Sequence, residues 1–210
     1  MSEPVDSSEP LIKTASVSVP SNPPLRLVSG TASIGDLDEF LAMLDAIGEE
    51  TGAVVQAFDA DLVVSETHLR EATRLAARSI TRGETVARDP SVEVLLYAAG
   101  RRQIDRALDL GVSEGEQRTI VLVADFGDVP GIGRSAVDLD AAVESIAEVL
   151  HSVDGEVLSS DGSVSSDPPC TDDTDRVREF YGITDRELTA TAGDISDIVR
   201  ERVALLDVEK

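Results

Sequence analysis

The sequence has little cysteine, almost no lysine and no long apolar run. One cysteine, Cys170, is present among 210 residues, which excludes an internal disulfide framework and a multi-cysteine zinc site. No apolar run reaches the roughly 18 residues that a membrane-spanning helix needs. The first thirty residues also lack the basic start and apolar block of a secretory signal. We therefore expect a soluble, cytoplasmic protein with no membrane partner.

Positive charge is scarce as well. Eighteen Lys and Arg stand against forty-one Asp and Glu, the formal net charge is −23, and the only lysines are Lys13 and Lys210. An acidic surface normally repels nucleic acid. It also suits a protein that works in concentrated salt, because the Debye length is only about 3 Å at 1 M and carboxylate repulsion is screened. We expect a halophilic source, so departures from the acidic background become informative.

Length and composition predict a single domain with flexible segments. Residues 1–23 are rich in Ser and Pro and predict a disordered tail. Residues 159–175 are acidic and of low complexity, which predicts a flexible insertion. We expect a core α/β domain over 24–158 and a C-terminal helical segment over 176–210 that packs on it. The expected fold is a small mixed, largely antiparallel sheet packed with several helices.

Local signals place the individual elements. Asp36 and Gly52 bracket one helical pattern, and Ser65 and Gly83 bracket another. Asp89-Pro90 begins a third helix, which the apolar pattern continues to Gly111 with an interruption at Gly100. The remaining expected elements are a strand near 25–28, a strand pair or bent strand over 53–64, a central strand at 119–124, and helices at 136–150, 177–181 and 194–206.

No catalytic constellation is visible. Asp125-Phe126-Gly127 spells the metal-binding tripeptide of kinases, but neither histidine is followed by Arg-Asp and no lysine lies between positions 14 and 209. His68 and His151 are 83 residues apart, outside any two-histidine metal pattern. We expect neither a metal nor a cofactor. The segment Gly127–Ser135 follows an apolar strand and precedes a helix, as a phosphate loop does, although its spacing is one residue too long and Arg134 replaces the lysine. A nucleotide- or phosphate-handling α/β enzyme using this loop is therefore the alternative.

One stretch breaks the acidic background. Residues 66–106 hold eight Arg against six acids, a net +2, whereas the other 169 residues carry −25. Arg70, Arg74, Arg78 and Arg82 repeat every four residues and form a slanting row roughly 18 Å long on a helix. Arginine grips phosphate with a planar fork and stacks on bases. The row and the pair Arg101-Arg102 favour RNA or another polyanion over a merely solvated, ion-paired face, and His68 in the same helix is a candidate to join them.

Several segments resemble a known family. The residues are Asp61-Leu-Val-Val-Ser65 with His68-Leu69, then Ser91-Val-Glu93 with Leu95-Leu96-Tyr97, and Gly100-x-Arg102-Gln-Ile104 with Ala107-Leu108. Tyr181-Gly-Ile-Thr184 and Glu201-Arg-Val-Ala-Leu-Leu206 are similar to the end of archaeal members. Together they resemble the kinase-binding (TPRKB-like, PRPK-binding) subunit of the KEOPS complex, in a haloarchaeal-type form, over about 25–150 and 178–207.

The resemblance implies a non-catalytic subunit of the complex that makes threonylcarbamoyladenosine in tRNA. It implies two partners: the small atypical kinase of the complex, and tRNA recruited through its 3′ CCA end. We expect RNA contacts from His68, Arg70, Arg74, Arg78, Arg82, Arg101 and Arg102. For the kinase we expect Ile104 and Leu108 as apolar anchors, unless they belong to the core. A purely structural scaffold without RNA contact is a third possibility.

Overall fold

The structure is a computed structural model that describes residues 19–127, 136–150, 157–158, 171 and 173–208. Four strands form one antiparallel sheet in the order β2-β3-β1-β4. They are β1 (Leu25–Ile34), β2 (Val54–Asp59), β3 (Gly115–Ala124) and β4 (Val157–Leu158). The main helices are α1 (Leu37–Thr51), α2 (Glu66–Arg82), α3 (Pro90–Ala98), α5 (Leu139–Val149), α6 (Thr174–Tyr181) and α8 (Ile195–Val208). Shorter ones are α4 (Ile104–Ala107), α7 (Asp185–Ala190) and the 3₁₀ turns η1 (Ala60–Leu62) and η2 (Leu108–Leu110).

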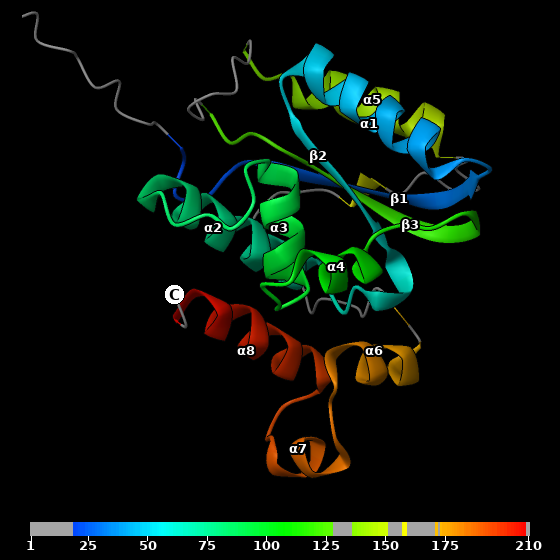
Figure 1. The fold of residues 1–210 in the computed structure, drawn as a ribbon. Helices are drawn as coiled ribbons and strands as arrows, with labels where there is room; N and C mark the ends of the chain where they lie inside the picture. The colour runs from blue at the N-terminus through cyan, green and yellow to red at the C-terminus, as the bar shows by residue number, and fades with distance from the viewer. Residues whose placement is uncertain (1–18, 128–135, 151–156, 159–170, 172, 209–210) are drawn as a thin grey trace, which may run out of the picture.

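Helices cover both faces of the sheet, as Figure 1 shows. The sequence of β3 is a continuous apolar run because both faces of this strand are buried. Ile120 and Leu122 point into the core shared with α2 and α3, whereas Val121 and Val123 point into the core shared with α1 and α5. The expected small mixed α/β fold with an antiparallel sheet is confirmed, and 119–124 is part of an inner strand.

The helix limits follow the capping signals. The side chains of Asp36, Ser65 and Asp89 accept hydrogen bonds from the first turns of α1, α2 and α3. Gly52 and Gly83 end α1 and α2 with φ of 71° and 69°, which is the left-handed conformation that glycine adopts without strain. These predicted limits are confirmed.

The predicted helix from Pro90 to Gly111 is wrong. Gly100 has a φ of 60°, and a Cβ at that position would lie 3.3 Å from the Cβ of Arg202 on α8. The chain therefore turns there, α3 ends at Ala98, and α4 and η2 form separate short turns. Gly100 is a point of close approach between α8 and the end of α3, where a side chain would be strained by the positive φ and would press on Arg202.

The C-terminal helices lie on the outer side of α2 and α3 (Figure 1). Val203 and Leu206 of α8 enter the core beside α2, and the hydroxyl groups of Ser196 and Ser65 are 3.2 Å apart. Helix α7, which the sequence did not predict, has no buried residue and begins with a capping box between Thr184 and Glu187.

The limits of the predicted flexible segments differ from the structure where residues are described. Val19 packs against the core and Pro23 is buried, so contacts begin before residue 24. At the other segment, Asp173 already caps α6. The remainder of the predicted tail and insertion lies outside the described residues.

Candidate nucleic-acid and partner interface

The α2 arginines, Arg70, Arg74, Arg78 and Arg82, form a row on an exposed side of α2. The opposite face buries Leu69, Ala72 and Ala76 completely. The four arginine side chains keep between 37% and 45% of their surface exposed. The four side chains that the spacing predicts to lie in one row are therefore all partly exposed to solvent.

Each of these arginines already has an acidic partner. Arg70 pairs with Glu66, and Arg74 binds Glu71 through two hydrogen bonds of 2.9 and 2.6 Å. The hydrogen bonds from Arg74 hold the pKa of the Glu71 carboxyl below its usual value. Exposed ion pairs of this kind contribute about 0–1 kcal/mol each, so a phosphate can replace the carboxylate at small cost.

The far end of the row converges on Asp207 of α8. Its carboxylate lies 3.4 Å from Arg78 and 3.8 Å from Arg82, and its other oxygen accepts a hydrogen bond of 3.2 Å from the Tyr97 hydroxyl. The Asp207 side chain is only 8% exposed. Asp207 therefore ties α8 to both α2 and α3 at the end of the row.

His68 does not belong to this surface, which corrects the expectation that it joins the arginines. Its side chain is completely buried, and its Nε2 lies 2.8 Å from the Ala98 carbonyl at the end of α3. The Tyr181 hydroxyl donates to the same carbonyl at 3.1 Å. Burial lowers the pKa of His68 to about 4, so the ring is neutral at physiological pH. His68 joins α2 to α3 and α6.

Arg101 is separated in its contacts from the α2 arginines. Its guanidinium donates to the Phe180 carbonyl of α6 and lies 5.1 Å from the centre of the Phe180 ring. The next residue, Arg102, is exposed and forms no ion pair with a described residue. The two predicted arginine groups are thus not brought together by shared contacts.

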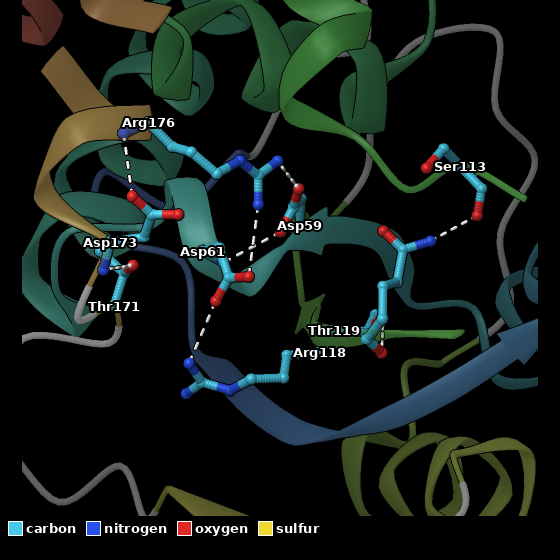
Figure 2. A network of polar contacts seen from close by, with 9 residues as sticks. Asp59, Asp61, Ser113, Arg118, Thr119, Thr171, Asp173 and Arg176 are labelled. Atoms are coloured by element: carbon cyan, nitrogen blue, oxygen red, sulfur yellow. Dashed lines mark hydrogen bonds and ion pairs between the residues drawn. The ribbon is translucent and has the colours of Figure 1, made fainter. Parts of the chain in front are cut away.

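A hollow opens beside Arg101. It has a volume of about 400 Å³, and its lining residues are Leu62, Arg101, Arg106, Asp109, Arg176, Glu179 and Phe180. Arg176 of α6 forms ion pairs with Asp59 at 2.6 Å and with Asp61 at 3.3 Å (Figure 2). Asp61 also accepts from Arg118 of β3 at 3.1 Å. These ion pairs fix the wall that α6 contributes.

Of these seven lining residues, sequence reasoning predicted Arg101 alone as a site residue and missed the other six, among them Arg106, Arg176 and Phe180. Arg106 lies within the basic stretch 66–106, so its positive charge could have marked it as a candidate site residue. Arg176 and Phe180 lie more than 65 residues further along the chain, and only folding brings α6 beside the end of α3. No local pattern could place them there.

Ile104 and Leu108, the expected kinase anchors, are exposed. Ile104 begins α4 and Leu108 begins η2, one helical turn later, and they keep 40% and 54% of their surface accessible. They are therefore not part of the core. Two large apolar side chains on one turn are suited to bury against a partner.

The remaining sequence candidates are the phosphate-like loop, a metal site and a membrane-spanning helix. Residues 128–135 of the Gly127–Ser135 loop lie outside the described residues. Among the residues that the structure does describe, no group of three or more His, Cys, Asp or Glu could hold a metal ion. None of the described helices is both long and apolar enough to cross a membrane.

A comparison with protein families decides the relationship of this chain. The family described as kinase binding protein CGI-121 matches residues 41–207, from within α1 to Asp207. The chain belongs to the CGI-121 family. Among curated proteins, none matches the sequence.

In this CGI-121 family member, a central residue of the recognised motif has a structural role. Glu93 is 1% exposed, and its carboxylate accepts hydrogen bonds from the Ser79 hydroxyl and from the backbone amides of Val86 and Ala87, at 2.9 to 3.0 Å. These contacts hold the segment between α2 and α3 in place. Glu93 thus fixes α2 relative to α3, while the α2 arginines are partly exposed and Ile104 and Leu108 are exposed.

Proposed function

We propose that the protein is a non-catalytic, kinase-binding subunit of a KEOPS-type complex that recruits tRNA by its single-stranded 3′ CCA end for threonylcarbamoyladenosine modification. Membership of the CGI-121 family supports the kinase partner, since the family is described as kinase binding. The observation that carries the RNA part is the exposed row of α2 arginines in a chain that is otherwise strongly acidic.

The Arg70 and Arg74 end of the row suits RNA because its charges are both accessible and exchangeable. Their partners Glu66 and Glu71 are partly exposed carboxylates on the same helix, so the pairs have little net stability to lose. Arg102 adds an exposed guanidinium beyond α3. Guanidinium planes can bind phosphates and stack on unpaired bases, and unpaired 3′ nucleotides present both groups.

The kinase contact is assigned to Ile104 and Leu108. Both are exposed and lie one turn apart, so a partner could cover them together.

The test compares intact tRNA with tRNA trimmed of its 3′ CCA, at high salt, using the complex of the full chain with the kinase. Trimming is expected to abolish binding, and Arg74→Gln/Arg78→Gln is expected to cause a matching loss. Arg186→Gln on α7 is the control, because Arg186 is exposed and forms no ion pair with a described residue. Equal affinity for both tRNAs would contradict the role of the 3′ end, and an unaffected double variant would contradict the role of the row.

A further inference from the structure

The hollow beside Arg101 has the size of a small-molecule site. Its volume of about 400 Å³ lies within the range of roughly 300 to 1,000 Å³ that is usual for ligand pockets. The segment 106–109, at the junction of α4 and η2, forms one wall, and α6 forms another. Leu62 of η1, which is only 4% exposed, is the most buried residue of the lining. A ligand there would contact parts of the chain that only the tertiary fold brings together.

Each of the two walls carries charges of both signs. Arg106 and Asp109 belong to the first wall, and Arg176 and Glu179 belong to α6. Arg176 is already paired with two carboxylates of the core, as Figure 2 shows. Arg106, Asp109 and Glu179 are exposed and form no ion pair with a described residue, so the opposite charges of the two walls do not meet. A bound molecule that carries both signs can join them.

A ligand with only one kind of charge is opposed by part of this lining. A phosphate or a dicarboxylate is attracted by Arg106 but repelled by Asp109 and Glu179, and a polyamine meets the reverse. An α-amino acid carries a carboxylate and an ammonium group on one carbon atom. Arginine binds a carboxylate through two parallel hydrogen bonds, and an ammonium group has three donors for the oxygens of Asp and Glu. The three side chains without an ion pair therefore match the charges of an amino acid.

Leu62 and Phe180 give the hollow an apolar part. Phe180 packs edge-on against Tyr181, with ring centres 4.7 Å apart and planes at 86°. The Arg101 guanidinium lies 5.1 Å from the centre of the Phe180 ring and donates to the Phe180 carbonyl, so Arg101 is held against α6. These contacts fix the ring in place. An apolar side chain that lies against Leu62 and the Phe180 ring is removed from water, which favours binding.

We propose that this hollow binds a free α-amino acid with an apolar side chain of the size of leucine or phenylalanine. The carboxylate lies at Arg106, the ammonium group lies at Asp109 and Glu179, and the side chain packs against Leu62 and Phe180. The site shares no residue with the α2 arginines, and it does not rest on the proposed function. A peptide end carries only one of the two charges, and the ligands below distinguish it from a free amino acid.

The first measurement titrates L-leucine and L-phenylalanine into the full chain and follows the amide chemical shifts by NMR. Saturable binding at one site is expected. The N-acetyl derivative lacks the ammonium group and the amide derivative lacks the carboxylate, so each is expected to bind at least tenfold more weakly than the parent amino acid. Absence of saturable binding by both amino acids would overturn the proposal. An equally tight N-acetyl derivative would assign the site to a peptide C-terminus, and an equally tight amide to a peptide N-terminus; either result also overturns it.

Two further ligands test the apolar contact. Glycine, which has no side chain, is expected to bind at least tenfold more weakly than L-leucine. D-leucine is expected to bind at least threefold more weakly than L-leucine, because the carboxylate, the ammonium group and the side chain are held at three separate points. Glycine that binds as tightly as L-leucine would overturn the role of Leu62 and Phe180. Equal binding of the two enantiomers would overturn the three-point arrangement.

Matched variants test the charged groups. Arg106, Asp109 and Glu179 are exposed, so Arg106→Gln and the double variant Asp109→Asn/Glu179→Gln are expected to keep the circular dichroism spectrum of the wild type. Arg106→Gln should weaken binding of L-leucine at least fivefold and leave L-leucinamide unchanged. The double variant should weaken L-leucine at least fivefold without weakening N-acetyl-L-leucine. Arg102→Gln, a neighbouring exposed arginine outside the lining, is the control and should bind as the wild type does. Normal binding of L-leucine by both test variants, or equal weakening of all three ligands, would overturn the assignment.

Discussion

The α2 arginines and the segment 101–108 differ in what their positive charges contact. Every α2 arginine has a carboxylate within 4.0 Å, from α2 itself, from Glu84 or from Asp207. Arg101 instead contacts a carbonyl and an aromatic ring, and among the described residues Arg102 and Arg106 have no acidic partner. Arginines that look equivalent in the sequence therefore differ in how readily they can bind an anion. An anion must displace a partner at the α2 row but can bind Arg102 and Arg106 directly.

The largest expected effect concerns the apolar side of the 101–108 segment. Leu108→Glu, or Ile104→Glu, should weaken binding to the kinase at least a hundredfold, because a charge in an apolar contact is left unpaired. Since both side chains are exposed, the variants should keep the circular dichroism spectrum and melting temperature of the wild type. Leu205→Glu, an exposed position on α8, is the control. Normal kinase binding by the folded variants would place the interface elsewhere.

The second prediction concerns His68, which lies beneath the α2 row. The folded-state pKa is about 4 against an ordinary 6.5, so the unfolded chain takes up a proton first as pH falls. The free energy of unfolding is therefore unaffected by His68 above pH 6.5 and declines between 6.5 and 4. From pH 7 to pH 5 the loss is about 2 kcal/mol.

Denaturant unfolding at both pH values measures this loss. His68→Gln removes the titrating ring, so its free energy of unfolding should change less over the same interval, whatever its value at pH 7. All other titratable groups are common to both proteins and cancel in the comparison. An equal decline in the two proteins would show that protonation of His68 is not opposed by the fold.

The third prediction tests the connection between α8 and the row. Asp207→Ala removes the shared partner of Arg78, Arg82 and the Tyr97 hydroxyl, and it should lower the free energy of unfolding by roughly 2 kcal/mol. Glu201→Ala, an exposed acid on the same helix that forms no ion pair with a described residue, is expected to change it by less than about 0.5 kcal/mol. If both variants lose the same stability, Asp207 is an ordinary surface residue.

How much of the fold and of the candidate site could be predicted depends on whether neighbouring residues in the sequence determine the feature. Ser65 and Asp89 set helix limits through their side chains and Gly83 through its backbone, and the sequence was sufficient for these local signals. The spacing of the α2 arginines likewise placed them on one exposed face. The predicted helix limit was wrong at Gly100, where the pattern of apolar residues continued although the glycine, with a φ of 60°, ends the helix in the left-handed conformation. The expectation for His68 was wrong because its burial comes from the end of α3 and from Tyr181, which lie far from it in the sequence.

The hollow beside Arg101 could not be predicted from the sequence. Its arginines belong to the basic stretch and to α6, and nothing near Arg176 or Phe180 in the sequence marks them as neighbours of Arg106. The ion pairs of Arg176 with Asp59 and Asp61 join residues more than 110 positions apart. Such a site is defined by tertiary contacts, and only a fold can place its parts together.

The smallest expected effect separates the two arginine groups most directly. If an arginine neutralises a phosphate of single-stranded RNA, its removal should reduce the slope of log affinity against log salt by about 0.7. Arg102→Gln and Arg106→Gln should each approach this value, because no carboxylate is released when the phosphate binds. For Arg70→Gln and Arg74→Gln the change should be smaller, because Glu66 and Glu71 neutralise these side chains in the unbound protein. Filter binding of tRNA at several salt concentrations measures the slopes. Equal changes for all four variants would show that the ion pairs on α2 are too weak to distinguish the two groups.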